Sequence, residues 1–572
     1  MDEKAAYAGC IKFALRQGRK NSIDPKRVRR FLTPYFCLTE ASMNLLKAKG
    51  SITTLLLAAL FFTLAYNTAF YHNVVLRYPL EQNLPFLISL TVLLFSSIAF
   101  FLGLVLNKFT IKPLLILLFV AAAVCGYFMN SYNVIIDAAM LRNSLMTDSR
   151  EVGDLISLRF IVYLLVLAIV PAIIICRMRV PCLPLKRELI GRLKYLAFFL
   201  ALMVANLLLM SEQYASFIRE QKDLRYYMNP LTFVYSATRF VEDALAGPDT
   251  GIRTVMGEDA RITHSPQQRK LLVLVVGEAT RADHWSLNGY ERDTNAPVAD
   301  DDVISLAHVR SCATSTAYSL PCMFSALGFD DFSLEDANAQ ENLLDVLQRA
   351  GVNVLWRDNN SDSKGVAVAV PFEDFRSPDV NPVCDVECRD VGMLAGLDGY
   401  IDAHPTGDIV VVLHQMGNHG PAYYKRYPKQ YERFTPVCKT NQIEDCTQEE
   451  IRNAYDNATL YSNAFLSSVI DFLQPRQSDF ATAMVYMADH GESLGEMGLY
   501  LHGLPYALAP DAQTHVASLM WFGRGFEQEG ERVRAKANQP LSHDNYFHTV
   551  LGMLNVDTGL HDPALDLLSP VR

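Results

Sequence analysis

The chain has 572 residues, of which half are hydrophobic and a fifth are charged. This length predicts two to four domains, and this composition excludes a disordered or collagen-like chain. The formal net charge of −10 is unevenly distributed, because residues 1–50 carry +7, residues 51–211 carry +6 and residues 212–572 carry −23. Since the large acidic part would be repelled by phosphate backbones, we expect no nucleic-acid partner.

Residues 51–211 contain five apolar runs, each close to the roughly 20 residues that a helix needs to cross a bilayer. They lie near 51–71, 84–105, 112–131, 157–176 and 193–211. A single run could be a buried core helix, but five in succession predict a membrane domain of five transmembrane helices. We expect no cleavable signal sequence before them, because the basic residues 1–50 lack the charged, apolar and small-residue order of one.

The positions of Lys and Arg predict which way the membrane domain faces. Besides residues 1–50, the connections after the second and fourth runs are basic; they hold Lys108, Lys112, Arg177, Arg179, Lys186, Arg187, Arg192 and Lys194. If these segments are cytoplasmic, an odd number of spans places residues 212–572 on the opposite face. In a Gram-negative cell this describes a multi-pass inner-membrane protein with a periplasmic soluble domain.

The cysteines agree with this orientation. Six of the 11 fall in the exported half as close pairs: Cys312 and Cys322, Cys384 and Cys388, Cys438 and Cys446. An even, locally paired set predicts three disulfides in an oxidising compartment. Zinc binding is the weaker alternative, because the spacings differ and no ligand pattern repeats.

The soluble half begins with a predicted connector over 212–265. Its aromatic residues have helical spacing between Tyr214 and Phe240, with a break at Asn229-Pro230. This helix could lie on the membrane surface or pack on the soluble domain.

From residue 266 onward, buried β-rich runs alternate with helical patterns, which predicts an α/β domain. The strands are expected at 271–276, 353–356, 408–414 and 482–488, and helices at 341–350 and 450–473.

Metal-ligating side chains follow these strands. Ligands in α/β sheets gather at the carboxyl ends of the strands, and there the chain places Glu278, His414, His419, Asp489, His490 and, a little later, His502. Each alone could be a cap or a hydrogen-bonding anchor. Together, carboxylate oxygens and imidazole nitrogens predict a site for Zn²⁺ or Mn²⁺.

The nucleophile is expected in the hydroxyl-rich segment between Cys312 and Cys322. If this segment opens a helix, the free N–H groups and the positive end of the helix dipole would face a phosphate, and a metal-bound threonine hydroxyl could attack it. The alternative is an ordinary Ser/Thr helix cap, and only the neighbouring metal ligands favour the reactive interpretation.

Six motifs together resemble the lipid A phosphoethanolamine transferases, a family that includes the mobile colistin-resistance enzymes. They are VVGEATRADHWSLNGYERDTNAP (275–297), CATSTAYSLPCMFS (312–325), LWRDNNSDSKG (355–365), CRDVGML (388–394), LHQMGNHGPAYYKRYP (413–428) and ADHGESLGEMGLYLHGLPYALAP (488–510). The resemblance covers about residues 51–555. It implies five spans and a catalytic domain of the alkaline phosphatase and sulfatase-like fold.

The resemblance also implies the roles of particular residues. It implies one tightly bound Zn²⁺, with a second left open, at Glu278, Thr316, Asp489 and His490, with Thr316 as the nucleophile. His419 and His502 match residues that hold the substrate phosphate or further zinc, and Ser361 and Lys364 match residues that contact phosphoethanolamine. Between the third and fourth spans, Asn143, Thr147 and Glu151 match substrate-binding positions.

The implied reaction has two steps: Thr316 takes phosphoethanolamine from phosphatidylethanolamine and then passes it to a lipid A phosphate, which weakens the binding of cationic peptides such as polymyxin. A core sugar, a periplasmic glucan or a protein are alternative acceptors. A sulfatase would need a C/S-x-P-x-R-type signature, which is absent, and a transporter or sensor would need charged residues within the spans.

The expected organisation is therefore a basic cytoplasmic segment (1–50), a five-span membrane domain (51–211), a connector with a membrane-surface helix (212–265) and a periplasmic catalytic domain (266–572). We expect a monomer surrounded by membrane lipids.

Overall fold

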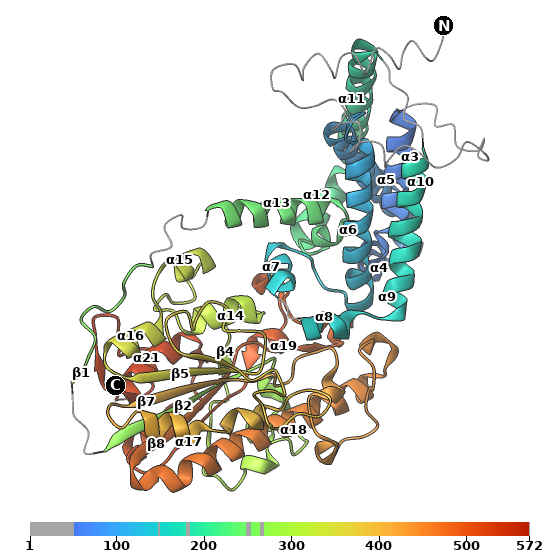
Figure 1. Ribbon diagram of the computed structural model, residues 1–572. Helices are drawn as coiled ribbons and strands as arrows, with labels where there is room; N and C mark the ends of the chain where they lie inside the picture. Colours follow the sequence, from blue (N-terminus) through green and yellow to red (C-terminus); the bar gives the residue numbers. More distant parts are fainter. Residues whose placement is uncertain (1–50, 147–148, 179–183, 247–252, 264–267, 571–572) are drawn as a thin grey trace, which may run out of the picture.

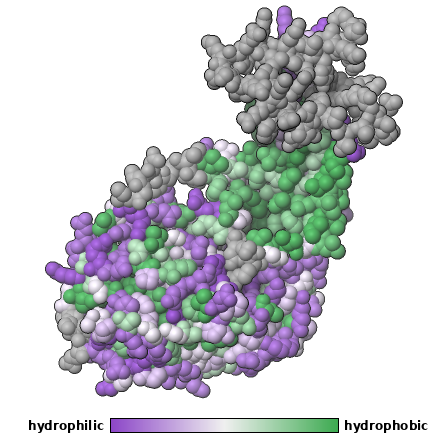
Figure 2. Space-filling model, viewed as in Figure 1, coloured by the Kyte–Doolittle hydropathy of each residue, from purple (hydrophilic) through white to green (hydrophobic). Residues whose placement is uncertain are grey.

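The computed structural model describes residues 51–146, 149–178, 184–246, 253–263 and 268–570. A bundle of long helices stands on a larger α/β domain, and short helices lie between the two (Figure 1). The expected basic segment 1–50 lies outside the described residues. The surface of the bundle is hydrophobic and that of the α/β domain is largely hydrophilic (Figure 2), as expected for a membrane domain joined to a soluble one.

Among the described residues, four helices are long and apolar enough to cross a membrane. They are α5 (Leu80–Val105), α6 (Ile111–Tyr132), the continuous helix Leu158–Arg177 and α11 (Leu185–Leu209). The third consists of α9 (Leu158–Leu164), a π-helical turn (Leu165–Ile169) and α10 (Val170–Arg177). These helices confirm the four expected spans from residue 84 onward. The helix α11 begins before the expected apolar run 193–211, because its first turns contain basic residues and so were not part of that run.

The first expected span is not one straight helix. It consists of α3 (Ser51–Ala65) and α4 (Thr68–Arg77), which meet at an angle of 53° and provide a fifth span if counted together. Asn67 lies at the bend, where its amide donates to the carbonyls of Phe62 and Asn229 and its oxygen accepts from the Asn229 N–H. A buried amide needs such partners, and it finds them where the helix is interrupted.

The connector contains α12 (Ser211–Glu220), a 3₁₀ turn (Leu224–Tyr227) and α13 (Leu231–Ala246). The expected break at Asn229-Pro230 separates the turn from α13, and the peptide there is cis. The helix α13 runs across the long axis of the bundle, part-way along its length (Figure 1), which is consistent with a membrane-surface position.

A mixed seven-stranded sheet forms the centre of the α/β domain, in the order β3-β12-β8-β2-β7-β5-β6. The four expected strands are its parallel centre: β2 (Arg269–Gly277), β5 (Asn353–Asp358), β7 (Ile409–His414) and β8 (Phe480–Ala488). The outer strands are β3 (Ile304–Ser305), β6 (Phe372–Asp374) and β12 (Ser518–Phe522), and β12 runs antiparallel to β8.

Helices cover both faces of this sheet (Figure 1). The long α18 (Gln448–Leu473) lies on one face, and α14 (Thr316–Met323), α16 (Leu343–Arg349) and α21 (Asp544–Met553) lie on the other. The three expected disulfides form, between Cys312 and Cys322, Cys384 and Cys388, and Cys438 and Cys446. The carboxyl ends of the parallel strands meet below α7 (Ala138–Met146) and α8 (Ser149–Leu155), at the foot of the membrane bundle.

Candidate active site

Four chemically reactive side chains converge where β2, β8 and α14 meet. Glu278 follows β2, Asp489 and His490 follow β8, and Thr316 is the first residue of α14. The hydroxyl of Thr316 lies 3.1 Å from Oε2 of Glu278 and 3.2 Å from Nε2 of His490. The same nitrogen lies 3.3 Å from Oε1 of Glu278 and 3.4 Å from Oδ2 of Asp489.

The charges in this cluster fit a cation. Oε1 of Glu278 and Oδ2 of Asp489 are buried and accept no hydrogen bond, while Nδ1 of His490 donates to the Gly491 carbonyl and leaves Nε2 facing the carboxylates. Burial lowers the pKa of His490, but the charges of Asp489 and Glu278 outweigh this and raise that pKa to about 10. Burial and the charge of Glu278 raise the pKa of Asp489. Two carboxylates and one imidazole at these distances form a donor set that suits Zn²⁺.

The segment that carries Thr316 is held from both sides. The Cys312–Cys322 disulfide closes it, and the Thr314 hydroxyl donates to the Leu504 carbonyl. His543 is fully buried; its Nδ1 accepts from the Cys312 N–H and its Nε2 donates to the carbonyl of Ala488, the last residue of β8. His543 therefore connects the loop that carries Thr316 with the strand that precedes Asp489 and His490.

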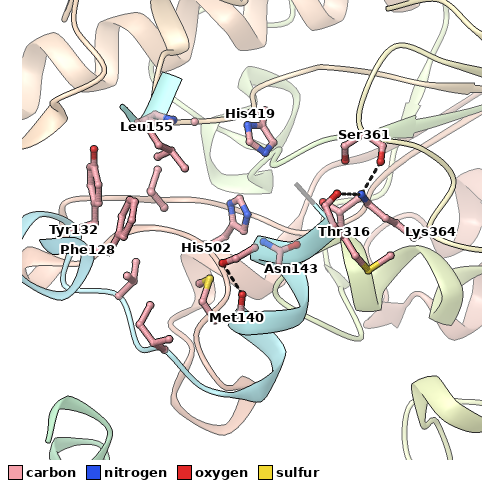
Figure 3. Close-up of a pocket in the computed structure, with 17 residues that line it drawn as sticks. Phe128, Tyr132, Met140, Asn143, Leu155, Thr316, Ser361, Lys364, His419 and His502 are labelled. Atoms are coloured by element: carbon pink, nitrogen blue, oxygen red, sulfur yellow. Dashed lines mark hydrogen bonds between the residues drawn. The ribbon is translucent and has the colours of Figure 1, made fainter. Parts of the chain in front are cut away.

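A cavity of about 130 Å³ opens beside Thr316 (Figure 3). Its polar end is lined by Thr316, Ser361, Lys364, His419 and His502, which come from four separate segments of the α/β domain. Its apolar end is lined by side chains of the membrane domain and its loop, among them Phe128, Tyr132, Ile136, Met140 and Leu155. Both domains therefore contribute to one cavity.

Lys364 joins the two halves of this cavity. Its side chain is 1 % exposed, and Nζ donates to the Ser361 carbonyl at 2.6 Å and to the Met146 carbonyl, at the end of α7, at 3.0 Å. Asn143 lies on α7 and lines the same cavity (Figure 3). Thr147 lies outside the described residues, and Glu151 is placed on α8 but its side chain is not described.

Comparisons with known proteins address both halves of the chain. A family model described as "Phosphoethanolamine transferase EptA/EptB" matches residues 94–245, and a sulfatase family model matches residues 270–556. The chain is 41% identical to the phosphatidylethanolamine transferase Mcr-2 of Escherichia coli over 518 residues, which are 88% of this chain and 95% of Mcr-2. The chain belongs to the phosphoethanolamine transferase family.

Other members of the family agree in sequence and in structure. The chain is 37% identical to the phosphoethanolamine transferase EptA of Salmonella typhimurium, over 91% of this chain and 97% of that protein. The solved structure of lipooligosaccharide phosphoethanolamine transferase A from Neisseria meningitidis superposes with a TM-score of 0.88 at 35% identity, covering 91% of this chain and 99% of that one. This phosphoethanolamine transferase thus has a membrane domain and a periplasmic domain of the alkaline phosphatase and sulfatase-like fold.

The structure of this phosphoethanolamine transferase also contains site residues that the sequence analysis did not assign. Asn360 donates to Oε2 of Glu278 at 2.8 Å and to the Gln415 carbonyl at 2.7 Å. Glu492 is paired with His502. Asn360 and Glu492 both lie within the motifs quoted above, so the sequence could have indicated them as site residues. His543 lies outside these motifs. His414 pairs with Asp358 instead and belongs to neither potential metal cluster of the described residues.

Proposed function

We propose that this enzyme transfers phosphoethanolamine from phosphatidylethanolamine to a lipid A phosphate. Thr316 is the nucleophile, and Glu278, Thr316, Asp489 and His490 hold one Zn²⁺. The observation that carries the proposal is the position of the Thr316 hydroxyl. It lies between two of the metal-ligating side chains and lines a cavity that also reaches the membrane helix α6.

The shape of the cavity supports a lipid donor. Its phosphate would lie at the polar end near Lys364, whose ammonium group donates to the carbonyls of Ser361 and Met146 and lies 3.8 Å from a carboxylate oxygen of Asp362. The glycerol and acyl chains would lie along Phe128 and Tyr132 of α6. This apolar lining favours a ligand with apolar groups, and a water-soluble donor would not need it. Asn143, Thr147 and Glu151 are proposed to contact the donor from the loop between α6 and α9.

The proposed chemistry depends on how the chain orients Thr316. Bound zinc would lower the pKa of the threonine hydroxyl and polarise the phosphate. Glu278, held by Asn360, fixes the hydroxyl from one side, and His490 fixes it from the other. Thr316 displaces diacylglycerol, and phosphoethanolamine is left on its oxygen. Ser361 and Lys364 then hold the transferred group while an acceptor phosphate displaces Thr316.

The names of relatives support an acceptor within lipopolysaccharide. The matched Neisseria protein is named for lipooligosaccharide, and a relative with 26% identity is named a Kdo(2)-lipid A phosphoethanolamine 7''-transferase, whose 7'' locant denotes a sugar position and so represents the core-sugar alternative. A lipid A phosphate is the proposed acceptor here, and the added ammonium group reduces the negative charge that attracts polymyxin. Core sugars, periplasmic glucans and proteins are the alternatives that the experiments must separate.

Thr316→Ala tests the nucleophile. Transfer should fall to background, because no neighbouring group can replace the oxygen between Glu278 and His490. Thr316→Ser should keep part of the activity, since it retains the hydroxyl with a less restricted rotamer. Ser315→Ala is the matched control, because the Ser315 side chain makes no capping hydrogen bond at the start of α14.

Mass spectrometry identifies both the intermediate and the acceptor. Wild-type enzyme with phosphatidylethanolamine and no acceptor should gain one phosphoethanolamine mass on the peptide that contains Thr316. Lipid A from cells expressing the enzyme should carry the same added mass. A mass on another residue would disprove the proposed nucleophile, and modification of the core sugars alone would disprove the proposed acceptor.

A further inference from the structure

Glu492 uses both of its carboxylate oxygens in hydrogen bonds at the edge of the active site. Oε2 accepts from Nδ1 of His502 at 2.7 Å, and Oε1 accepts from the Tyr423 hydroxyl at 2.7 Å. The Glu492 side chain is fully buried, and that of His502 is 10 % exposed. A buried carboxylate accepts hydrogen bonds and does not donate them, so Nδ1 of His502 must carry its proton.

This bond determines what His502 offers to the substrate. With Nδ1 turned toward Glu492, the other ring nitrogen, Nε2, is the atom left for the cavity, which His502 and Thr316 both line (Figure 3). The His502 ring lies with its centroid 4.2 Å from that of His490 and 5.7 Å from that of His419. The orientation of His502 is therefore set from behind, by a residue outside the cavity lining.

Glu492 also contacts the segment that carries His419. Tyr423 and His419 lie in the same stretch after β7, and the three residues 420–422, of which Gly420 is the first, separate them. A Cβ at Gly420 would come within 2.5 Å of Oε1 of Glu492 and 2.7 Å of the Tyr423 hydroxyl, so the backbone passes directly against this hydrogen bond. The Glu492 carboxylate therefore contacts both His502 and the segment that carries His419, the two histidines that line the cavity.

We propose that Glu492, anchored by Tyr423, is a positioning residue that orients His502 and sets its separation from His419, so that the two imidazoles hold the transferred phosphate between them. The inference rests on the proposed function and deepens it. It assigns a role to Glu492 and Tyr423, whereas the family resemblance concerns His502 and His419 themselves.

A competing interpretation has a structural basis. Ligand atoms of His490, Glu492 and His502 lie within 4.8 Å of one another and could hold a metal ion. In that arrangement Glu492 would be a ligand and its charge would be essential. In the positioning role, only its hydrogen-bond acceptors are needed. An isosteric amide separates the two cases, because it keeps an acceptor for His502 but is a poor metal ligand.

The test uses full-length enzyme in phospholipid vesicles with three variants. Glu492→Met removes both acceptors and should lower kcat/KM for phosphatidylethanolamine by about 100-fold, the upper end of effects seen for residues that orient a ligand group. Glu492→Gln should keep at least about a third of the wild-type value. Tyr423→Phe deletes one neutral hydrogen bond and should lower kcat/KM by about two- to tenfold. Tyr424→Phe, its sequence neighbour, is the matched control.

Two further readouts exclude a merely structural effect. Zinc content and melting temperature should equal those of wild type in Glu492→Gln, and zinc content should be unchanged in Glu492→Met. Loss of both activity and one zinc ion in Glu492→Gln would overturn the proposal in favour of a metal site, and a fully active Glu492→Met would overturn it outright. Failure of the proposed function would be recognised separately, because wild-type enzyme would then not load Thr316.

Discussion

At the residue scale, the active site contains two buried carboxylates whose charge the chain neutralises only in part, through His490. Burial by itself would raise the pKa of Glu278, but the charge of the adjacent His490 holds that pKa well below its usual range. Oδ1 of Asp489 accepts from two backbone N–H groups, of Ala279 and His490, which leaves Oδ2 directed at the cluster. A bound dication would compensate both carboxylates, so the metal should contribute to the stability of the fold.

Zinc should therefore stabilise this enzyme in a way that depends on Glu278. Zinc added to the metal-free protein should raise its melting temperature. At a zinc concentration 100 times the dissociation constant, the free energy of unfolding should increase by about 2.7 kcal/mol. Glu278→Gln should remove most of this shift, because the amide removes a negative charge from the site. Scanning calorimetry measures both, and an equal shift in the variant would place the zinc elsewhere.

His543 predicts a pH-dependent stability. Burial and the charge of His490 lower the pKa of His543 to about 4, against about 6.5 in an unfolded chain. The unfolded state therefore binds the proton more readily. The contribution of neutral His543 to the free energy of unfolding is therefore complete above pH 6.5 and is lost as the pH falls toward 4. The total loss is about 3 kcal/mol.

His543→Leu should flatten this loss between pH 6.5 and 4. It should also lower stability at neutral pH by about 1–3 kcal/mol for each hydrogen-bonding group left unpaired, on Cys312 and on Ala488. Denaturant titration at several pH values is the measurement, with the exposed His308→Leu as control. If the acid slope were unchanged in His543→Leu, other groups would have to cause it.

At the element scale, the sequence predicted those helices and strands whose burial leaves a hydrophobic pattern within the segment itself. The strand at 271–276 is a continuous apolar run because it is buried on both faces, and it was predicted on that basis. The edge strand β6 has three residues of mixed exposure and leaves no such pattern. Within the active site, the reactive residues were predicted from motifs, but the bonds of Glu492 and His543 could not be, because they depend on how distant segments fold together.

The bend between α3 and α4 illustrates the same limit. Its cause is Asn67, whose partner Asn229 lies 162 positions away. Asn67→Ala should leave the N–H and carbonyl of Asn229 without this partner in a buried part of the membrane domain. The expected cost is about 1–3 kcal/mol per unpaired group, seen as a lower melting temperature in detergent. Asn83→Ala is the control, because that amide donates to the exposed carbonyl of Pro79. Equal losses in both variants would contradict the explanation.

At the scale of the whole molecule, the cavity exists only while the two domains are docked. Asp154, on α8, accepts from Lys425 and, at 3.3 Å, from Arg426 of the catalytic domain. Arg159, at the start of α9, pairs with Glu444 and Asp445, each at 3.2 Å. The Arg426 side chain is 3 % exposed and also donates to the His419 carbonyl, so the docking contact is connected to the active site.

Asp154→Ala should therefore impair the use of a lipid donor more than the chemistry itself. Loss of the carboxylate should let α8 move away from the cavity, together with its last residue, Leu155, which lines the cavity. A displacement of this kind should lower transfer from phosphatidylethanolamine in vesicles by about tenfold. Loading of Thr316 from glycerophosphoethanolamine, which has no acyl chains, should change by less than about twofold, since the proposed site for that headgroup is formed mainly by the catalytic domain. Asp293→Ala removes an ion pair that is about half exposed, with Arg433 inside the catalytic domain, and should change neither rate. Equal losses with both donors in Asp154→Ala would show that the contact acts on the catalytic residues rather than on the apolar wall of the cavity.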